Sequence, residues 1–337
     1  MTRRWSSEVR IREGLTGANL TTFAVGGAVE TLLEAASVAG ATEIVTHLHN
    51  EHQSVKILGA GSNVVLPDEG LSEPIVALGR EFNHIQLLTS PLSTSLFERS
   101  NWRSGEFDPN PLADLAEGEG IRIFALAATP LMGLSRRLSA LGLSGLEFAA
   151  GIPATVGGAL RMNAGAHGRS IGELVSSVLY LDQKGDLKLS AASEIAFHYR
   201  RTDLGEGALV LGVEFALVRG AAEVISEERN RCLEHRRLTQ PLHLPSSGSV
   251  FRNPSQETVP SANLPSDLSV SAGWLLEQAG LKGLRRGGVE FSPLHANWLV
   301  KVDSIARADD VRALVAIGRE RVQAEFGIEL VPEIVFW

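Results

Sequence analysis

The stretch "GIPATVGGALRMNAGAHG", residues 151–168, limits the folds that this chain can adopt, because it holds five glycines and only one charged residue, Arg161. Glycine inside a regular element costs roughly 0.5–1 kcal/mol relative to alanine. A cluster this dense indicates that a ligand or another segment comes close to the main chain.

A second glycine segment, "ILGAGSN" (57–63), follows a predicted strand, and consecutive backbone N–H groups there can form an anion-binding concavity. It is not a Rossmann loop, because the third glycine of G-x-G-x-x-G is missing and "VVL" (64–66) predicts another strand rather than a helix. No G-x-x-x-x-G-K-[ST] phosphate loop occurs either. Each segment alone also fits a tight turn. Together, with the side chains of Ser62 and Asn63, they favour a dinucleotide held by a non-Rossmann fold.

Composition narrows the class of protein. A chain of 337 residues predicts two or three domains. The net charge of −8, without a lysine- or arginine-rich run, argues against a nucleic-acid partner. No stretch approaches the roughly 20 apolar residues of a membrane span, and the first residues lack the apolar run of a signal peptide, so we expect a cytoplasmic protein. Cys232 is the only cysteine, which excludes an internal disulfide and a cysteine-based zinc site.

The apolar pattern predicts alternating strands and helices, with one long interruption at about 88–119 that is rich in Ser, Pro, Asn and acids and reads as a surface loop. The predicted elements are a helix at 41–52, two strands within 55–66, a strand at 121–129, a helix at 130–145, a hairpin at 175–190, a strand at 207–220 and a charged helix at 221–238.

His47, His49 and His52 raise the alternative of a metal site, since His49 and His52 have the i, i+3 spacing of helical ligands. No cysteine accompanies them, and Glu51 is the only adjacent carboxylate. We therefore expect a solvated helix end and no metal.

Seven segments occur in the order typical of one enzyme family: "LTTFAVGGAVETLLE" (20–34), "ILGAGSNVVLPDEGL" (57–71), "GLSGLEFAAGIPATVGGALRMNAGAHG" (142–168), "FHYRRTDL" (197–204), "GSVFRNP" (248–254), "AGWLLEQAGLKGLRRGG" (272–288) and "HANWLVKV" (295–302). Through them the chain resembles the UDP-N-acetylenolpyruvoylglucosamine reductases (MurB), from about residue 18 to its C-terminus. The glycine segments alone suggest only the wider group of FAD proteins, whereas "GSVFRNP" with "AGWLLEQAGLKG" is far more specific.

The resemblance implies an α+β protein with a two-subdomain FAD-binding fold of the PCMH or vanillyl-alcohol-oxidase type, plus a smaller α+β substrate domain. The expected parts are FAD-binding subdomain 1 (1–80), FAD-binding subdomain 2 (81–219), a substrate-binding domain (220–325) and a C-terminal strand (326–337). The substrate domain lacks the longer tyrosine-bearing insertion of one MurB subtype, so the chain is similar to the second subtype.

The resemblance also implies which residues bind FAD. The pyrophosphate loop would be Gly59, Gly61, Ser62, Asn63 and Val64. The second flavin-lining segment would be Gly151, Ile152, Pro153, Thr155, Val156, Gly157, Gly158 and Asn163. NADPH would be the co-substrate that reduces the flavin.

Reducing an enol ether of pyruvate requires a hydride donor, a cation for the developing negative charge and a proton donor for the neighbouring carbon. The resemblance implies that flavin provides the hydride, Arg200 stabilises the enolate, Ser249 donates the proton, and Glu333 orients or polarises the site. Tyr199 and Asn253 would contact the substrate, UDP-N-acetylglucosamine enolpyruvate. The product, UDP-N-acetylmuramate, belongs to peptidoglycan synthesis and thus to cell-wall biogenesis, cell shape and division.

Two of the residues with a role in the reaction also have a simpler interpretation. Arg200 fits a surface arginine beside a turn, and Ser249 fits a turn serine bonded to its own backbone. The alternation of Ile328, Leu330, Ile334 and Phe336 predicts a strand, with Glu333 on the opposite face among Val331, Val335 and Trp337. An acidic residue such as Glu333 among apolar side chains favours a functional role.

Two other functions stay open at this point. One is a flavin oxidase of small alcohols with the same FAD domain, and the other is a flavin- or sugar-nucleotide-binding protein without turnover. Four positions depart from the family pattern, and we expect them to change substrate affinity more than activity: Ala154, Arg252, Val331 and Val335.

Overall fold

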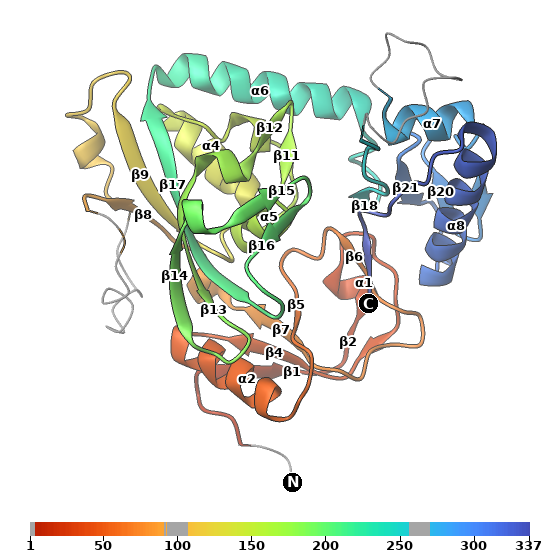
Figure 1. The fold of residues 1–337 in the computed structure, drawn as a ribbon, viewed down its shortest axis with the longest axis horizontal. Helices are drawn as coiled ribbons and strands as arrows, with labels where there is room; N and C mark the ends of the chain where they lie inside the picture. Colours follow the sequence, from red (N-terminus) through yellow and green to blue (C-terminus); the bar gives the residue numbers. More distant parts are fainter. Residues whose placement is uncertain (1–3, 91, 93–106, 256–269) are drawn as a thin grey trace. The chain divides into compact units, whose positions relative to one another are not determined.

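The computed structural model describes residues 4–90, 92, 107–255 and 270–337 (Figure 1). Of the predicted surface loop at 88–119, residues 91 and 93–106 therefore lie outside the described residues. Contacts divide the chain into two compact units, which we describe separately. Unit 1 comprises Met1–Glu13, Thr31–Ala60 and Glu73–His235, and unit 2 comprises Gly14–Glu30, Gly61–Ser72 and Arg236–Trp337.

Unit 1 contains a four-stranded sheet in the order β1 (Val9–Arg12), β4 (Leu32–Ala35), β7 (Ile75–Leu78) and β5 (Lys56–Ile57). β1 is antiparallel to β4, whereas β4 and β5 both run parallel to β7. The helix predicted at 41–52 is confirmed as α2 (Val38–Asn50). It begins at Ser37, whose side chain accepts a hydrogen bond from the Gly40 N–H.

The second sheet of unit 1 is antiparallel, in the order β14 (Leu187–Ala191), β13 (Val175–Leu181), β17 (Leu209–Arg219), β9 (Gly120–Leu126) and β8 (Ile85–Leu88), with β10 (Leu143–Ser144) paired to β17. The hairpin predicted at 175–190 is thus confirmed as β13–β14.

Alternate side chains of the second sheet enter two different cores, as the two-residue repeat of a strand requires. On β9, Ile123 and Ala125 belong to a core that includes residues of α4 (Leu131–Ala140) and α5 (Val156–Arg161). Phe124 and Leu126 belong to another core, which includes residues of α2, β4 and β7. Both sheets of unit 1 therefore share one core.

Shorter elements complete unit 1: β11 (Gly165–Ala166), β12 (Arg169–Ser170), β15 (Ala196–His198) and β16 (Arg201–Asp203). The charged helix predicted at 221–238 is confirmed as α6 (Ala222–Thr239), along which the chain leaves unit 1 after His235.

Unit 2 is built on an antiparallel sheet in the order β18 (Ser246–Ser249), β21 (Trp298–Lys301), β20 (Val289–Phe291) and β19 (Arg285–Arg286), with α7 (Ala272–Gln278) and α8 (Ala308–Phe326). Its N-terminal segments add α1 (Gly17–Leu20), the pair β2 (Leu15–Thr16) and β3 (Ala28–Val29), and β6 (Val64–Val65), which runs parallel to β22 (Val335–Phe336).

The contacts group the chain differently from the four parts expected from sequence, because 14–30 and 61–72 join the C-terminal residues. The strand expected across 326–337 is shorter in the structure, since only Val335–Phe336 is a strand there. Ile328, Leu330 and Ile334 are buried as their alternation predicted, but Val331 and Val335 are 52% and 40% exposed. Two of the three apolar residues expected around Glu333, Val331 and Val335, therefore face solvent, and Trp337 is half-buried.

No helix in the described part of the chain combines the length and the apolar character needed to cross a membrane.

Candidate functional site

The loop from Gly59 to Ser62 offers unused backbone donors. Within residues 4–90, 92, 107–255 and 270–337, no hydrogen bond is donated by the amides of these four residues. Since a run of backbone N–H groups can bind an anion, this is the chemistry that the pyrophosphate prediction requires.

Gly61 is a position where glycine is needed, because its φ is +65° and a Cβ would lie 2.1 Å from the carbonyl oxygen of Leu20. Its own carbonyl accepts a hydrogen bond from the Thr22 N–H at 3.0 Å. The Thr22 hydroxyl in turn donates to the carbonyl of Ser246 at 2.6 Å. Within unit 2, hydrogen bonds thus link this loop to the strand β18 that carries Ser249.

The two glycine segments meet inside unit 1. A Cβ on Gly59 would lie 2.7 Å from the Thr155 Oγ1 and 3.8 Å from the Gly158 Cα. Thr155 caps α5 by accepting from the Gly158 N–H at 3.3 Å. The structure therefore brings together one residue of the predicted pyrophosphate loop and two of the predicted flavin-lining segment.

The other predicted flavin-lining residues lie on both sides of that contact. Gly151, Ile152 and Pro153 precede α5, and Val156 and Gly157 form its first turn. The amides of Val156 and Gly157 are already bonded to the carbonyls of Thr129 and Ala127. The amides of this part of the segment are therefore not available to bind an anion, but its glycines allow another group to approach the backbone closely.

Asn163 follows α5 with φ +39° and is buried. Its side-chain amide donates to the His198 carbonyl at 2.9 Å, and its side-chain oxygen accepts from the Gly172 N–H at 3.0 Å. This predicted cofactor residue thus ties the glycine segment to the end of β15, immediately before Tyr199 and Arg200.

Arg200 lies in the two-residue turn between β15 and β16, with φ +58°, which is unusual for a residue with a side chain. Its guanidinium donates to the Gly165 carbonyl at 3.1 Å and lies 4.9 Å from the centre of the Tyr199 ring. The Arg200 side chain thus reaches the second glycine segment instead of extending into solvent. Its neighbour Arg201 is exposed and pairs with Asp203.

Ser249 follows a β-bulge, since Ser247 and Gly248 together lie opposite one residue of β21 and Gly248 has φ +77°. Bulges redirect the side chains that follow them. Among the described residues the Ser249 hydroxyl has no hydrogen-bond partner, so it is not a turn serine bonded to its own backbone.

Glu333 is held through its main chain. Its N–H donates to the Val250 carbonyl at 2.8 Å, and its carbonyl accepts from the Asn63 side-chain amide at 3.0 Å. Unit 2 therefore joins three predicted site residues. Asn63 bonds Glu333 directly, and Glu333 bonds Val250, the residue after Ser249.

Asn253 is exposed, and its side-chain oxygen accepts from the Ala272 N–H at the start of α7. This hydrogen bond fixes the orientation of the Asn253 side-chain amide. Sequence reasoning gave His295 no role, and it missed Asn297; both lie beside the Ser249 segment and are considered below.

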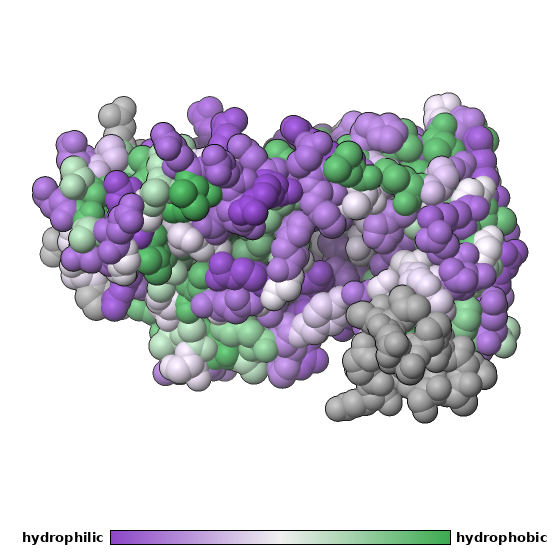
Figure 2. Space-filling view, turned by 90° about the horizontal axis from the view of Figure 1, so that it is seen from above, coloured by the Kyte–Doolittle hydropathy of each residue, from purple (hydrophilic) through white to green (hydrophobic). Residues whose placement is uncertain are grey.

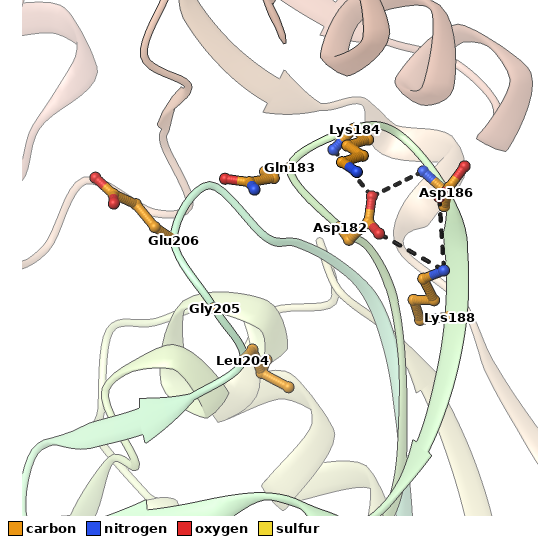
Figure 3. A pocket seen from close by; sticks show the side chains of 8 residues that line it. All are labelled: Asp182, Gln183, Lys184, Asp186, Lys188, Leu204, Gly205 and Glu206. Atoms are coloured by element: carbon orange, nitrogen blue, oxygen red, sulfur yellow. Dashed lines mark hydrogen bonds and ion pairs between the residues drawn. The ribbon is translucent and has the colours of Figure 1, made fainter.

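A surface cavity of about 370 Å³ lies elsewhere in unit 1, between the β13–β14 turn and the loop after β16 (Figure 3). Burial opposes ionisation of Asp182, but hydrogen bonds from the Asp186 and Lys184 amides, together with Lys188, lower its pKa. The carboxylate is thus committed to its own turn, and none of the predicted site residues lines this cavity.

Figure 2 shows polar side chains over most of one face, with apolar residues in small groups among them. Tyr199, predicted to contact substrate, is one of the large apolar side chains exposed on the molecule, at 52%.

Comparison with known proteins gives a consistent result. The C-terminal domain of UDP-N-acetylenolpyruvoylglucosamine reductase matches residues 240–337. The enzyme of that name from Synechococcus sp. (strain JA-3-3Ab) is 36% identical over 96% of this chain and 90% of its own length. The one from Halalkalibacterium halodurans is 32% identical over 97% and 93%. The crystal structure of MurB from Thermus caldophilus superposes with a TM-score of 0.73 at 28% identity, over 98% of this chain and 99% of that one.

The fold and these matches define an oxidoreductase of α+β architecture. More closely, the chain belongs to the UDP-N-acetylenolpyruvoylglucosamine reductase family, which confirms the resemblance read from its motifs.

Proposed function

We propose that this protein reduces UDP-N-acetylglucosamine enolpyruvate to UDP-N-acetylmuramate, with NADPH as reductant and FAD as bound cofactor, in peptidoglycan precursor synthesis. The observation that carries the proposal is the hydrogen bond from the Glu333 N–H to the Val250 carbonyl, because it joins the segment of the proposed proton donor Ser249 to the proposed site glutamate.

The residues present fit a dinucleotide cofactor. The amides of Gly59 to Ser62 donate to no group of the described chain, and the glycine at 59 leaves open the space that a Cβ would fill against Thr155. Gly59, Gly61, Ser62, Asn63 and Val64 would hold the pyrophosphate. When bound, FAD supplies the hydride for the terminal vinyl carbon.

The protein's own groups perform the rest of the reaction. The Arg200 guanidinium binds the substrate carboxylate and stabilises the negative charge that develops as hydride arrives. The Ser249 hydroxyl then donates its proton to the carbon next to the carboxylate, completing the saturated ether. Glu333 polarises this hydroxyl, and Tyr199 and Asn253 contact the sugar nucleotide.

The visible spectrum of the purified protein, followed anaerobically, tests the proposal. A flavin band should bleach with NADPH and return when UDP-N-acetylglucosamine enolpyruvate is added. A band that stays bleached would remove the substrate from the proposal. A colourless protein that takes up no added FAD would overturn it entirely.

Replacing Ser249 with alanine should slow flavin reoxidation by the enolpyruvyl substrate by roughly 10²- to 10⁴-fold, the usual contribution of a general acid. Flavin reduction by NADPH should stay unchanged, because it requires no proton from Ser249. The exposed Ser304, changed to alanine, is the matched control. A non-catalytic binding protein would show no reoxidation to lose.

A further inference from the structure

Asn297 immediately precedes β21 and is 4% exposed. Its side-chain oxygen accepts from the Phe251 N–H at 2.9 Å, and its side-chain NH2 donates to the Phe251 carbonyl at 2.8 Å. Its own carbonyl accepts from the Val250 N–H at 2.9 Å. One buried asparagine thus binds two consecutive residues directly after Ser249.

The Asn297 side chain makes the pair of hydrogen bonds that a neighbouring strand backbone usually makes. β18 pairs with β21 as far as Ser249 opposite Trp298. Beyond that pair the segment that precedes β21 turns away from the sheet, because the Trp298 N–H bonds back to the His295 carbonyl. The amide of Asn297 then takes the place of a peptide group and continues the pairing to Phe251.

The opposite edge of the same segment binds the C-terminal residues. The Arg252 N–H donates to the Val331 carbonyl at 2.9 Å, and the Val250 carbonyl accepts from the Glu333 N–H at 2.8 Å. Hydrogen bonds that hold residues 250–251 in place therefore also hold the main chain of Glu333 in place. On its other side, the Asn297 N–H donates to the His295 Nδ1 at 3.2 Å.

We propose that Asn297 is a positioning residue that holds Ser249 and Glu333 in register for proton transfer to the substrate. The inference rests on the proposed function of those two residues. Because displacement of a reacting group by about 1 Å can cost roughly 100-fold in rate, loss of this amide should slow flavin reoxidation by the enolpyruvyl substrate roughly 10- to 100-fold. Reduction of the flavin by NADPH should stay unchanged.

The decisive variant is Asn297→Asp, compared with Asn297→Ala. An ionised carboxylate still accepts from the Phe251 N–H but cannot donate to its carbonyl, whereas a protonated carboxyl can do both, as the amide does. Burial raises the pKa of such a carboxyl. Reoxidation by Asn297→Asp, relative to wild type, should therefore recover as the pH falls from about 8 to about 5.5, and Asn297→Ala should show no recovery.

The groups that could confuse this profile are His295 and Glu333. Burial and, to a lesser degree, Lys282 lower the pKa of His295, which favours the neutral ring that accepts from Asn297. Asn297→Ala keeps both groups and adds no new carboxyl, so a recovery at low pH that occurs in Asn297→Asp and not in Asn297→Ala depends on the carboxyl at position 297.

A second measurement does not depend on turnover. Amide hydrogen exchange at Val250 and Phe251 should be faster in Asn297→Ala than in wild type, and the same pH decrease should restore relative protection in Asn297→Asp. Val322→Ala is the control for lost stability, since Val322 is fully buried on α8 and makes none of these hydrogen bonds.

The outcomes separate the two proposals. The ratio to compare is the rate of flavin reoxidation by the substrate over the rate of flavin reduction by NADPH. The positioning role holds if Asn297→Ala lowers this ratio, while Val322→Ala lowers the unfolding temperature and leaves the ratio unchanged. Equal half-reaction ratios in wild type and Asn297→Ala would overturn it. Wild type that binds flavin but is never reoxidised by the substrate would overturn the proposed function instead, and the exchange data would then decide the positioning of residues 250–251 alone.

Discussion

Arg200 has a side chain in a backbone conformation that glycine adopts more readily, with φ +58°. For a residue with a Cβ this conformation costs about 1–2 kcal/mol. Arg200→Gly should therefore be more stable than Arg200→Ala by about 1 kcal/mol, measured by urea unfolding. Both should lose roughly 10²- to 10³-fold in kcat for reduction of the enolpyruvyl substrate, because both lack the guanidinium that we propose stabilises the developing charge.

The control for Arg200 is its exposed neighbour, Arg201→Ala, which should keep wild-type turnover. If Arg200→Gly kept full activity, the guanidinium would have no role in the reaction, and its bond to the Gly165 carbonyl would be only a means of closing the turn.

Sequence motifs predicted Arg200, Ser249 and Glu333 as site residues, and the structure corrects the reasoning about the surroundings of Glu333. Of the alternating residues along 328–336, Ile328, Leu330 and Ile334 are buried and Phe336 is half-buried, whereas Val331 and Val335 face solvent. The hydrogen bonds of the buried Asn163 and Asn297 side chains could not be predicted, because a buried amide that bonds distant main-chain groups has no local pattern in a sequence. Only the fold brings His198 to Asn163 and Phe251 to Asn297.

The start of α8 shows how one element depends on a distant segment. Arg307, at the N-cap position, offers no side-chain acceptor. Instead the Asp68 carboxylate accepts from the Ala308 and Asp309 amides, each at 2.9 Å. Asp68→Ala should cost about 1–2 kcal/mol of stability, as loss of a helix cap does. Urea unfolding measures this, with the exposed neighbour Glu69→Ala as control. Equal losses in both variants would contradict the capping role.

The first sheet of unit 1 carries an ion pair that makes its stability depend on pH. The Arg10 guanidinium binds both oxygens of Glu81, at 2.8 and 2.6 Å, and its Nε binds Glu34 at 2.7 Å. The hydrogen bond from Arg10 is the main reason that the pKa of Glu81 falls to about 2, while burial acts in the opposite direction.

Because the folded-state pKa of Glu81 lies below its unfolded value, the pair stabilises the protein above about pH 4.5 and loses this effect as pH falls toward 2. Glu81→Gln should lower stability near pH 7 by about 1 kcal/mol, since Arg10 is partly exposed to solvent. The same change should flatten the fall in unfolding temperature between about pH 5 and 2. The exposed Glu13→Gln is the control; an unchanged pH profile in Glu81→Gln would contradict the assignment.

Long elements were predictable from sequence because periodicity accumulates along them, as in α2, the β13–β14 hairpin and α6. Two-residue strands such as β6 and β22 carry no periodicity of their own. They exist because Val64 and Val335 become neighbours in the folded chain, a contact that joins residues near opposite ends of the sequence.

At the scale of the whole molecule, the division of the chain follows contacts rather than sequence order. Unit 2 takes 14–30 and 61–72 from the N-terminal part, which the family resemblance placed in one subdomain over 1–80. These segments place Phe23, Val25 and Val65 in the core of unit 2, where each is at most 3% exposed. Asp68, on the second of them, caps α8.

A fragment of residues 236–337, which contains the matched C-terminal family domain, should therefore not fold cooperatively alone. Loss of three buried side chains removes roughly 1.5–3 kcal/mol each, and the total is comparable with the 5–15 kcal/mol by which whole domains are typically stable. Urea unfolding followed by circular dichroism should show a broad, shallow transition. In the full chain, Phe23→Ala should destabilise unit 2 by about 3–5 kcal/mol, read by hydrogen exchange at Leu275 and Val311 in its core. A sharp transition in the fragment would mean that the C-terminal residues form a core without the N-terminal segments.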